Sequence, residues 1–349
     1  MKRHTIFRKA AGLGIAVMTA LSLVWMAGPA MAVTLKIQSA FPHGDLSMDL
    51  LKKFADEAEK NSNGKIKVKV FADPEIVPMD QLFGATKRGV VDMLQCAGVI
   101  WQGIVPAAGV EFGLPMAYRI EGETEFAKQA EAIRDFFFKE GAIDVMRQEY
   151  AKHGLYFLDI HTYGPVPFML APKPYQSCAD LNGKKIRTDG ILHSYFGGVG
   201  MQGASISGLE TYMALKLGTV DAAEWDVSAV TGLKWNEVAP YWIRGMENDH
   251  CIGHILINMK SWEKLGAAEK KALEAAGEVY WKASVDGYGK ELESVRALIK
   301  EGKVNEVILD ESCQAKFKEV AYQLWDQVAK EDPTSARMVE LLKKWRGAK

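Results

Sequence analysis

The sequence predicts an α/β protein with two α/β lobes around a central cleft. Stretches with the two-residue alternation of strands and stretches with the 3.6-residue repeat of helices follow one another along the chain. The strand-like stretches form two groups, one before about residue 100 and one after Tyr156. One late strand, residues 251–259, stands apart and must join a sheet formed earlier. A chain that passes several times between two groups of strands forms two hinged lobes, and the cleft between the lobes is a natural ligand site.

The first lobe opens with alternating strands and helices. Residues 35–39 and the alternating Lys and apolar residues of 65–70 predict strands, and residues 48–61 predict an amphipathic helix. A second helix is expected over residues 79–88, followed by a short apolar strand over residues 90–94. The turns between these elements are short, as in right-handed crossovers within one sheet.

A helix-rich segment, residues 122–153, leads into the second group of strands. Residues 156–160 and 184–188 predict strands, and residues 209–217 predict a short helix that ends at a glycine. Residues 270–298 have a nearly continuous helical pattern. This stretch is therefore the longest helix that the sequence predicts.

The N-terminal segment predicts secretion to the periplasm. Four basic residues and no acid precede the apolar, uncharged residues 10–27, and Ala30 and Ala32 then form an A-x-A site. This is the pattern of a signal peptide, here cleaved after Ala32. An uncleaved membrane anchor is the less favoured alternative, because the apolar run is short for a span and ends at a processing site.

The mature chain is long enough for two lobes. Cleavage leaves 317 of the 349 residues, and the loss of four positive charges changes the formal net charge from −1 to −5. We place lobe I in residues 33–157 plus about 248–285, and lobe II with the C-terminal helices in residues 158–247 plus about 286–349. The acidic balance argues against nucleic-acid binding, and any bound anion requires a local cation.

The chain has four cysteines and no C-x-x-C pair: Cys96, Cys178, Cys251 and Cys313. A disulfide is permitted in an oxidising periplasm, but the spacing does not give the pairing. Four partly buried free thiols are an equal alternative.

The sequence contains no H-E-x-x-H, no G-x-S-x-G and no phosphate-binding Walker loop, so we expect a binding protein and no enzyme. His250 and His254 are four residues apart, but they lie in a predicted strand, where a metal site is less favoured.

Two segments place candidate ligand contacts at strand ends. Arg187 lies where a predicted strand ends and a glycine-containing loop begins, and there its guanidinium can pair with a carboxylate through two hydrogen bonds. Glu224 and Trp225 end another strand, where an acid can hold a cation or hydroxyl while the indole packs on the ligand. The alternatives are a surface arginine paired with a nearby acid, a core tryptophan and an acid near a hinge.

At these residues the sequence resembles the periplasmic solute-binding subunit of tripartite ATP-independent periplasmic (TRAP) transporters, the DctP family. Gly183-Lys184-Lys185-Ile186-Arg187 is similar to the family's G-x-K-I/M-R segment, and residues 210–221 match E-x-Y-x-A-L-x-x-G-x-V-D. The resemblance covers nearly all of the mature chain. It implies a bilobal periplasmic binding protein with a long connecting helix, for which residues 270–298 are the candidate. It also implies that Arg187 binds the substrate carboxylate.

Within the family, the chain is most similar to the 2-oxo acid-binding branch, through the segments 101–103, 112–115 and 223–225. That resemblance implies that a sodium or calcium ion bridges to the substrate and that no other cofactor is present. The implied metal contacts are Glu224, Trp225 and, from the segment that completes the site, Glu247; its neighbour Asn248 is an implied substrate contact.

The chain departs from that branch at Val166, where the branch has a glutamine that touches both substrate and sodium. This departure weakens the case for sodium and for a strict 2-oxo acid. Tyr163 or His161 takes the place of the glutamine in our interpretation, which gives a different or larger substrate.

We therefore expect a protein that closes on a small organic acid and delivers it to a TRAP membrane permease. The expected ligands are monocarboxylates and 2-oxo acids, aromatic ones included. Arg187 neutralises the carboxylate, while Trp225, Tyr163 and Phe41 cover the body of the ligand. A sensor that presents its closed form to a receptor and a secreted enzyme with an unfamiliar site are the alternatives. The amphipathic residues 321–345 either form a homodimer interface or pack on the same chain as a monomer.

Overall fold

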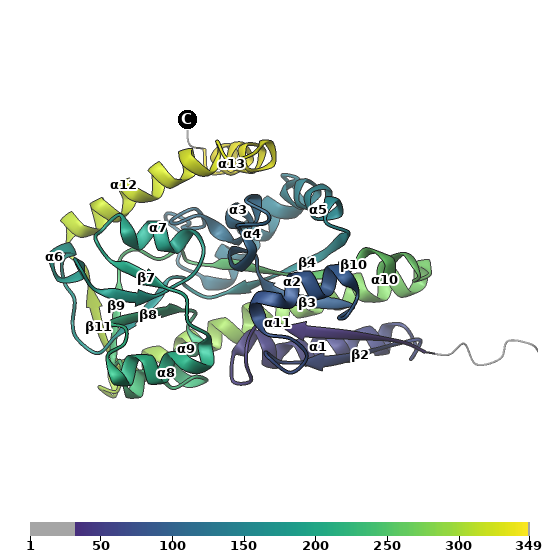
Figure 1. Cartoon of the computed structure of the whole chain (residues 1–349), viewed down its shortest axis with the longest axis horizontal. Coiled ribbons are helices and arrows are strands. Elements are labelled where there is room, and N and C mark those ends of the chain that lie inside the picture. Colours follow the sequence, from purple (N-terminus) through teal and green to yellow (C-terminus); the bar gives the residue numbers. More distant parts are fainter. Residues whose placement is uncertain (1–31, 348–349) are drawn as a thin grey trace, which may run out of the picture.

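The computed structural model describes residues 32–347, so the predicted signal peptide lies outside the described residues except for its last position. Two sheets lie side by side, the first on the right of Figure 1 and the second on the left, with helices on their faces. This architecture confirms the predicted bilobal α/β class. None of the helices within residues 32–347 has the length and hydropathy of a membrane span.

The first sheet has five strands and is mixed. Its strands in spatial order are β2 (Ile66–Phe71), β1 (Val33–Ser39), β3 (Met93–Ala97), β10 (Cys251–Asn258) and β4 (Leu155–Tyr163). β1 pairs in parallel with both β2 and β3, whereas β10 is antiparallel to β3 and β4. Every residue of β10 is buried, which agrees with its mostly apolar sequence. The prediction that this late strand joins an earlier sheet is confirmed.

The second sheet has six strands and carries most of the charged residues discussed below. Its order is β11 (Asn305–Ile308), β9 (Tyr241–Arg244), β5 (Phe168–Ala171), β8 (Ala222–Trp225), β6 (Lys185–Arg187) and β7 (Gln202–Ala204). β6 lies between β7 and β8 and is parallel to both. The carboxyl ends of β6 and β8 therefore meet at one edge, where they place Arg187 and Trp225 close together.

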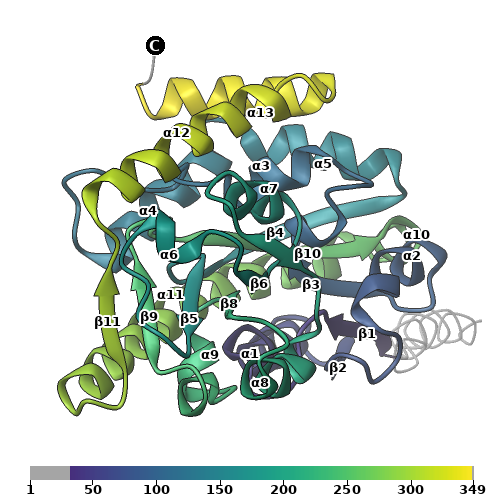
Figure 2. The same cartoon turned by 60° about the vertical axis from the view of Figure 1, so that its left-hand side comes forward.

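Helices surround the sheets and close the ends of the molecule (Figures 1 and 2). They are α1 (Leu46–Asn61), α2 (Met79–Arg88), η1 (Gly98–Trp101), α3 (Ala107–Gly113), α4 (Phe126–Phe138), α5 (Ala142–Lys152), α6 (Cys178–Leu181), α7 (Ile191–Gly197), α8 (Gly208–Leu217), α9 (Ser228–Thr231), η2 (Trp235–Glu237), α10 (Met259–Glu263), α11 (Ala267–Lys300), α12 (Glu311–Val328) and α13 (Pro333–Trp345). The predicted helix over residues 79–88 has the bounds of α2.

The predicted strand over residues 90–94 is shifted in the structure, where β3 begins at Met93. Gly89 has a φ of 77° and ends α2, and Val90 is exposed. The Asp92 side chain accepts a hydrogen bond from the backbone of Lys36, which fixes the approach to the strand. The apolar sequence begins at Val90, which belongs to the turn, so the prediction placed the start of the strand three residues too early.

The long helix α11 has 34 residues and runs beside both sheets. It packs against α1 and β4 of the first lobe and against α9 near the second sheet. A helix that touches both lobes agrees with the connecting helix implied by the resemblance.

The C-terminal segment forms two helices. Asp332 caps α13 by accepting hydrogen bonds from the backbone of Thr334 and Ser335, and Pro333 occupies the first helical position. α12 packs on α7, whereas α13 packs on α3 and α5. We keep the division into two lobes as a proposal, with the refinement that α13 lies against the first lobe.

One disulfide ties the second lobe to the C-terminal helices. It joins Cys178 in α6 to Cys313 in α12, two residues that are 135 positions apart in the sequence. Cys96 and Cys251 are free and buried. The structure thus gives the pairing that the spacing left open.

Candidate functional site

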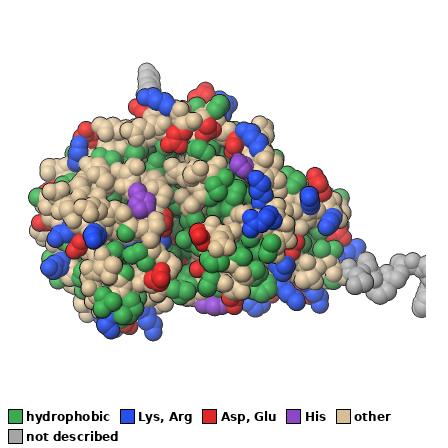
Figure 3. Space-filling view, viewed as in Figure 1, with side chains coloured by type: hydrophobic (Ala, Val, Ile, Leu, Met, Phe, Trp, Pro, Cys, Tyr) green, Lys and Arg blue, Asp and Glu red, His purple; other side chains and the backbone are tan. Residues whose placement is uncertain are grey.

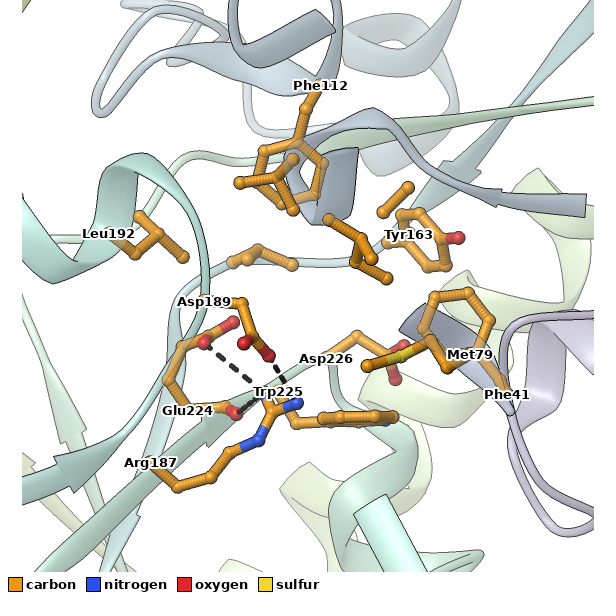
Figure 4. Close-up of a pocket in the computed structure, with 14 residues that line it drawn as sticks. Phe41, Met79, Phe112, Tyr163, Arg187, Asp189, Leu192, Glu224, Trp225 and Asp226 are labelled. Atoms are coloured by element: carbon orange, nitrogen blue, oxygen red, sulfur yellow. Dashed lines mark hydrogen bonds and ion pairs between the residues drawn. The ribbon is translucent and has the colours of Figure 1, made fainter. Parts of the chain in front are cut away.

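A cavity lies between the lobes, at the carboxyl ends of β6 and β8. It contains about 470 Å³ of space between protein atoms, including the part open to solvent. Its walls differ in chemistry (Figure 4). The first lobe and the β4–β5 connection supply apolar and aromatic side chains, and the second sheet supplies every charged one. The lining residues are Phe41, Met79, Ala97, Val99, Ile100, Phe112, Tyr163, Val166, Arg187, Asp189, Leu192, Glu224, Trp225 and Asp226.

Arg187 is the one cation among the lining residues, and its side chain is fixed on several sides. The residue is 3% exposed, and its guanidinium carbon lies 4.5 Å from the centroid of the Trp225 ring. Nε donates to the Ile206 carbonyl oxygen at 2.8 Å, and Nη1 donates to the Glu224 carbonyl oxygen at 3.2 Å. The guanidinium is therefore held over an indole ring at the cavity wall.

Two carboxylates already pair with this guanidinium (Figure 4). Asp189 Oδ2 lies 2.6 Å from Arg187 Nη2, and Glu224 Oε2 lies 3.6 Å from Nη1. A ligand carboxylate that binds Arg187 must therefore compete with Asp189. Because a buried bidentate pair is stronger than a single contact, a ligand that presents two oxygens has the advantage.

Glu224 is buried and holds its proton more tightly than an ordinary glutamate. Burial raises its pKa from 4.5 to about 7, Arg187 opposes that shift, and Asp189 adds to it. The Thr188 hydroxyl donates to its carboxylate at 2.9 Å. The charge of this wall therefore changes near neutral pH.

A second pair of acids lies beside the cavity. Burial raises the pKa of Asp226 well above its ordinary value, and the neighbouring Asp45 raises it further. Asp226 accepts hydrogen bonds from the Ser228 backbone at 2.7 Å and from the Tyr288 hydroxyl at 3.2 Å. Asp45 accepts from the Trp225 indole nitrogen at 2.9 Å and caps α1. The same acid thus fixes the ring on which Arg187 lies.

Aromatic rings form the opposite part of the cavity. The Phe41 ring meets Trp225 edge-on at 5.6 Å between centroids and meets Tyr163 edge-on at 5.8 Å. Trp235 packs behind Trp225 at 5.4 Å. With Phe112 of α3, the four lining rings come from the loop after β1, from α3, from the end of β4 and from the end of β8, so only the folded chain brings them together.

The structure brings together five of the seven predicted substrate contacts: Phe41, Tyr163, Arg187, Glu224 and Trp225. His161 is completely buried behind Tyr163, where its Nε2 lies 2.8 Å from the amide nitrogen of Gln95. It is not among the lining residues.

Asn248 also lies away from the cavity. Its side chain accepts from the backbone of Tyr118 at 3.0 Å and donates to the Leu114 carbonyl at 3.1 Å, while its backbone pairs with Val166. It holds the crossover between the lobes, a role that its position in the sequence did not reveal.

Glu247, an implied metal contact, has its oxygens engaged elsewhere. It lies 3.0 Å from Arg244 Nε and accepts from the backbone of Gly245 and Met246 at 2.7 and 2.9 Å. Within residues 32–347, no three His, Cys, Asp or Glu side chains are grouped as metal ligands. Glu247 therefore does not fit a metal site shared with Glu224 and Trp225.

Asp189 and Asp226 are the charged cavity residues that sequence reasoning missed. A signal for both was present. Asp189 follows Arg187 by two positions, and Asp226 follows Trp225 directly at the same strand end. Residues just beyond the carboxyl end of a parallel strand are those expected at a ligand site.

Gly190 makes a close contact between the lobes. A Cβ atom at this position would lie 2.3 Å from Val99 Cγ2 and 2.5 Å from the Val99 carbonyl oxygen. Beside it, the Ile191 backbone donates to Gln102 Oε1 at 3.0 Å, which also joins the two walls. The cavity can close to this extent because position 190 has no side chain.

We expect Gly190→Ala to weaken ligand binding at least about tenfold, because the added methyl group holds the two walls of the cavity apart. The unfolding midpoint should change little, because the methyl group lies outside the cores of both lobes. Gly183→Ala is the matched control, since Gly183 also has a positive φ, 75°, but has no neighbour within 4 Å of the added Cβ. Calorimetric titration and thermal unfolding measure the two effects. Equal losses of affinity in both variants would show that backbone strain, and not the contact with Val99, is responsible.

The chain matches a known family over most of its length. Residues 38–332 match the DctP family, described as bacterial extracellular solute-binding protein, family 7. A relative from Nostoc, the monocarboxylate 2-oxoacid-binding periplasmic protein all3028, is 24% identical over 214 residues, which are 60% of this chain and 56% of the relative.

Solved structures share the fold. A TRAP transporter solute-binding protein from Bordetella bronchiseptica, with copurified calcium and picolinate in its active site, has a TM-score of 0.78 and 22% identity over 91% of this chain and 92% of that one. A TRAP periplasmic solute-binding protein from Chromohalobacter salexigens with bound (S)-(+)-2-amino-1-propanol has a TM-score of 0.80 and 19% identity over 90% and 96%. The family match over more than half of the sequence confirms the resemblance, and the chain belongs to the DctP family of bacterial extracellular solute-binding proteins.

Proposed function

We propose that this protein binds a small organic acid through Arg187 and that its signal peptide is removed after Ala32. The family consists of periplasmic solute-binding proteins, not enzymes, and TRAP members deliver small organic acids to membrane permease subunits. The observation that carries the proposal is the position of Arg187, the one cation among the lining residues of the cavity, over the Trp225 ring.

The character of the other wall supports a small organic body. Phe41, Tyr163 and Phe112 offer apolar surface. Val166 adds an aliphatic group at the position where the 2-oxo acid-binding branch has a glutamine. Closure around such a ligand removes water from the guanidinium, which strengthens its charge-assisted hydrogen bonds. The acids named in the relatives, picolinate and 2-oxo acids, support a carboxylate ligand with a planar or short body.

A bridging cation remains part of the proposal, with two of the three implied contacts. Glu224 and Trp225 line the cavity and stay the proposed contacts for sodium or calcium, whereas Glu247 does not, because its oxygens bond to Arg244 and two backbone amides.

A thermal-unfolding screen tests the proposal. The mature protein is unfolded and refolded with its disulfide intact, to remove bound ligand, and is mixed with monocarboxylates, 2-oxo acids, dicarboxylates and aromatic acids. A ligand at a hundredfold excess over its dissociation constant adds about 2.7 kcal/mol to the free energy of unfolding. We expect one class of acid to raise the unfolding temperature of the protein. Members of that class should compete with one another for the site. The absence of stabilisation by every acid would contradict the proposed ligand class.

The affinity for an acid is expected to fall as the pH rises from 6 to 8, by up to about tenfold. The pKa of Glu224 is raised to about 7, and a bound carboxylate beside Arg187 further favours the protonated form. Binding therefore takes up a proton, which becomes less favourable as the pH rises through 7. Calorimetric titration at several pH values measures the slope, and Glu224→Gln should flatten it. A slope that is the same in both proteins would assign the proton to another group.

A further inference from the structure

The cavity is lined by more acidic than basic side chains. Arg187 faces three carboxyl groups, those of Asp189, Glu224 and Asp226, and it pairs with the first two. Within residues 32–347, no Lys, Arg or His nitrogen lies within 4 Å of the carboxylate of Asp226 or of its neighbour Asp45. A ligand with only a carboxylate would add negative charge to this wall.

Asp226 faces the cavity and has only neutral partners. It is 5% exposed, and both of its oxygens accept hydrogen bonds from groups without charge, the Ser228 amide and the Tyr288 hydroxyl. Figure 4 shows its carboxylate on the side of Phe41, beyond the pair of Arg187 and Asp189. A buried acid without a cation is costly, and a cationic partner from the ligand would remove that cost.

The aromatic rings near Asp226 have the arrangement that attracts an ammonium group. Phe41 stands edge-on to both Trp225 and Tyr163, so three ring systems border the space into which Asp226 points. Ring faces attract cations, most strongly those of tryptophan, and the attraction grows when water is excluded. The cavity thus combines the Asp226 carboxylate with aromatic rings, and a positive group is attracted by both.

The Trp225 indole links this space to the anion-binding side. Arg187 lies 4.5 Å from its ring centroid, and Phe41 lies 5.6 Å from it by centroids. A small molecule lying along the indole can therefore present an anionic group to Arg187 and a cationic group to Asp226.

We infer that the ligand is a small zwitterion, an amino acid or its N-methylated derivative, whose carboxylate pairs with Arg187 and whose ammonium lies beside Asp226 and the ring of Phe41. This inference rests on the proposed function, because it needs Arg187 as the carboxylate site. A zwitterion has no net charge, so it leaves the net charge of the cavity unchanged, while each of its charged groups lies beside a group of opposite charge.

The test compares acids that share a carbon skeleton and differ in one group. Alanine, lactate and pyruvate form one set, and phenylalanine, phenyllactate and phenylpyruvate form another, with the N-trimethyl derivative of each amino acid added. Ligand-free protein, treated with EDTA, is titrated with each compound in a calorimeter. We expect the amino or trimethylamino member of one set to bind at least tenfold more tightly than its oxo and hydroxy counterparts.

Two variants assign that preference to a residue. Asp226→Asn keeps an oxygen for Ser228 and Tyr288 but removes the charge, and it should reduce the preference to less than about threefold. Asp249→Asn is the matched control, because Asp249 is another partly buried acid with a raised pKa, is bonded to the Ile120 backbone and does not line the cavity. It should leave the preference unchanged.

The other outcomes separate this inference from the proposed function. Arg187-dependent binding of oxo or hydroxy acids without a preference for the amino form would overturn the zwitterion and leave the proposed function intact. A preference that appears only when calcium or sodium is restored would also overturn it, since Asp226 would then hold a metal ion. Failure of every carboxylate to bind would overturn both.

Discussion

Replacement of Arg187 by glutamine should weaken ligand binding at least about thirtyfold. Truncating one partner of a buried, hydrogen-bonded charge pair costs about 2–5 kcal/mol, because the ligand carboxylate is left without its counter-charge in a water-poor cavity. Arg187→Lys keeps the charge but loses the planar fork and the stacking on Trp225, so its affinity should fall between those of the two other proteins. Titration calorimetry with the acid identified by the unfolding screen measures all three.

The chain provides a close control for this experiment at Arg244. Its guanidinium lies 4.5 Å from the Trp242 ring centroid and pairs with Glu247 and Glu306, so it has the same kinds of partner as Arg187 but lies outside the cavity. Arg244→Gln should bind ligand as the wild type does. A loss of affinity of similar size in both variants, or an Arg187→Gln protein that binds within threefold of the wild type, would remove the carboxylate site from Arg187.

Reduction of the Cys178–Cys313 disulfide should lower the free energy of unfolding by about 2–5 kcal/mol. The bond closes a loop of 135 residues, and long loops restrict the unfolded chain most. It also anchors the start of α12, whose Trp325 indole donates to the Pro115 carbonyl of the first lobe at 2.9 Å. Urea denaturation with and without reductant measures the effect.

The double variant Cys178→Ser/Cys313→Ser separates this bond from other effects of the reductant. Its midpoint should match that of the reduced wild type and should not change when reductant is added, since Cys96 and Cys251 are buried free thiols in both proteins. A wild-type midpoint that is insensitive to reductant under conditions that demonstrably open the bond would contradict the prediction.

Local sequence patterns were sufficient to predict the elements whose boundaries depend on residues nearby in the sequence. α2 ends at a glycine in the left-handed region, and its bounds followed from the sequence. α11 has few helix breakers and a continuous repeat, so it too could be predicted. Arg187, Glu224 and Trp225 were found because strand ends are local features and because the family motif covers them.

Residues whose roles depend on pairing between distant segments could not be assigned in this way. His161 is buried because β10 pairs with β4 and places Gly253 beside it, a contact that the order of residues does not contain. Asn248 bonds to Tyr118 and Leu114, more than a hundred positions away. The shared environment of Asp45 and Asp226 likewise arises only when the first and second lobes meet.

One face of the molecule carries charges of both signs. In Figure 3, basic and acidic side chains are interspersed over that face. This distribution agrees with the formal net charge of −1 of the sequence.

The position of β10 has a consequence for the way this protein matures. It lies between β3 and β4 in the first sheet, yet it follows β4 by almost ninety residues, and β11 joins the second sheet later still. The first sheet cannot be completed before residues 251–258 have been made, and the second cannot be completed before residues 305–308. A shorter chain lacks a strand of one or both sheets. The strand order that builds the cleft thereby also makes the folding of both lobes depend on the last third of the chain.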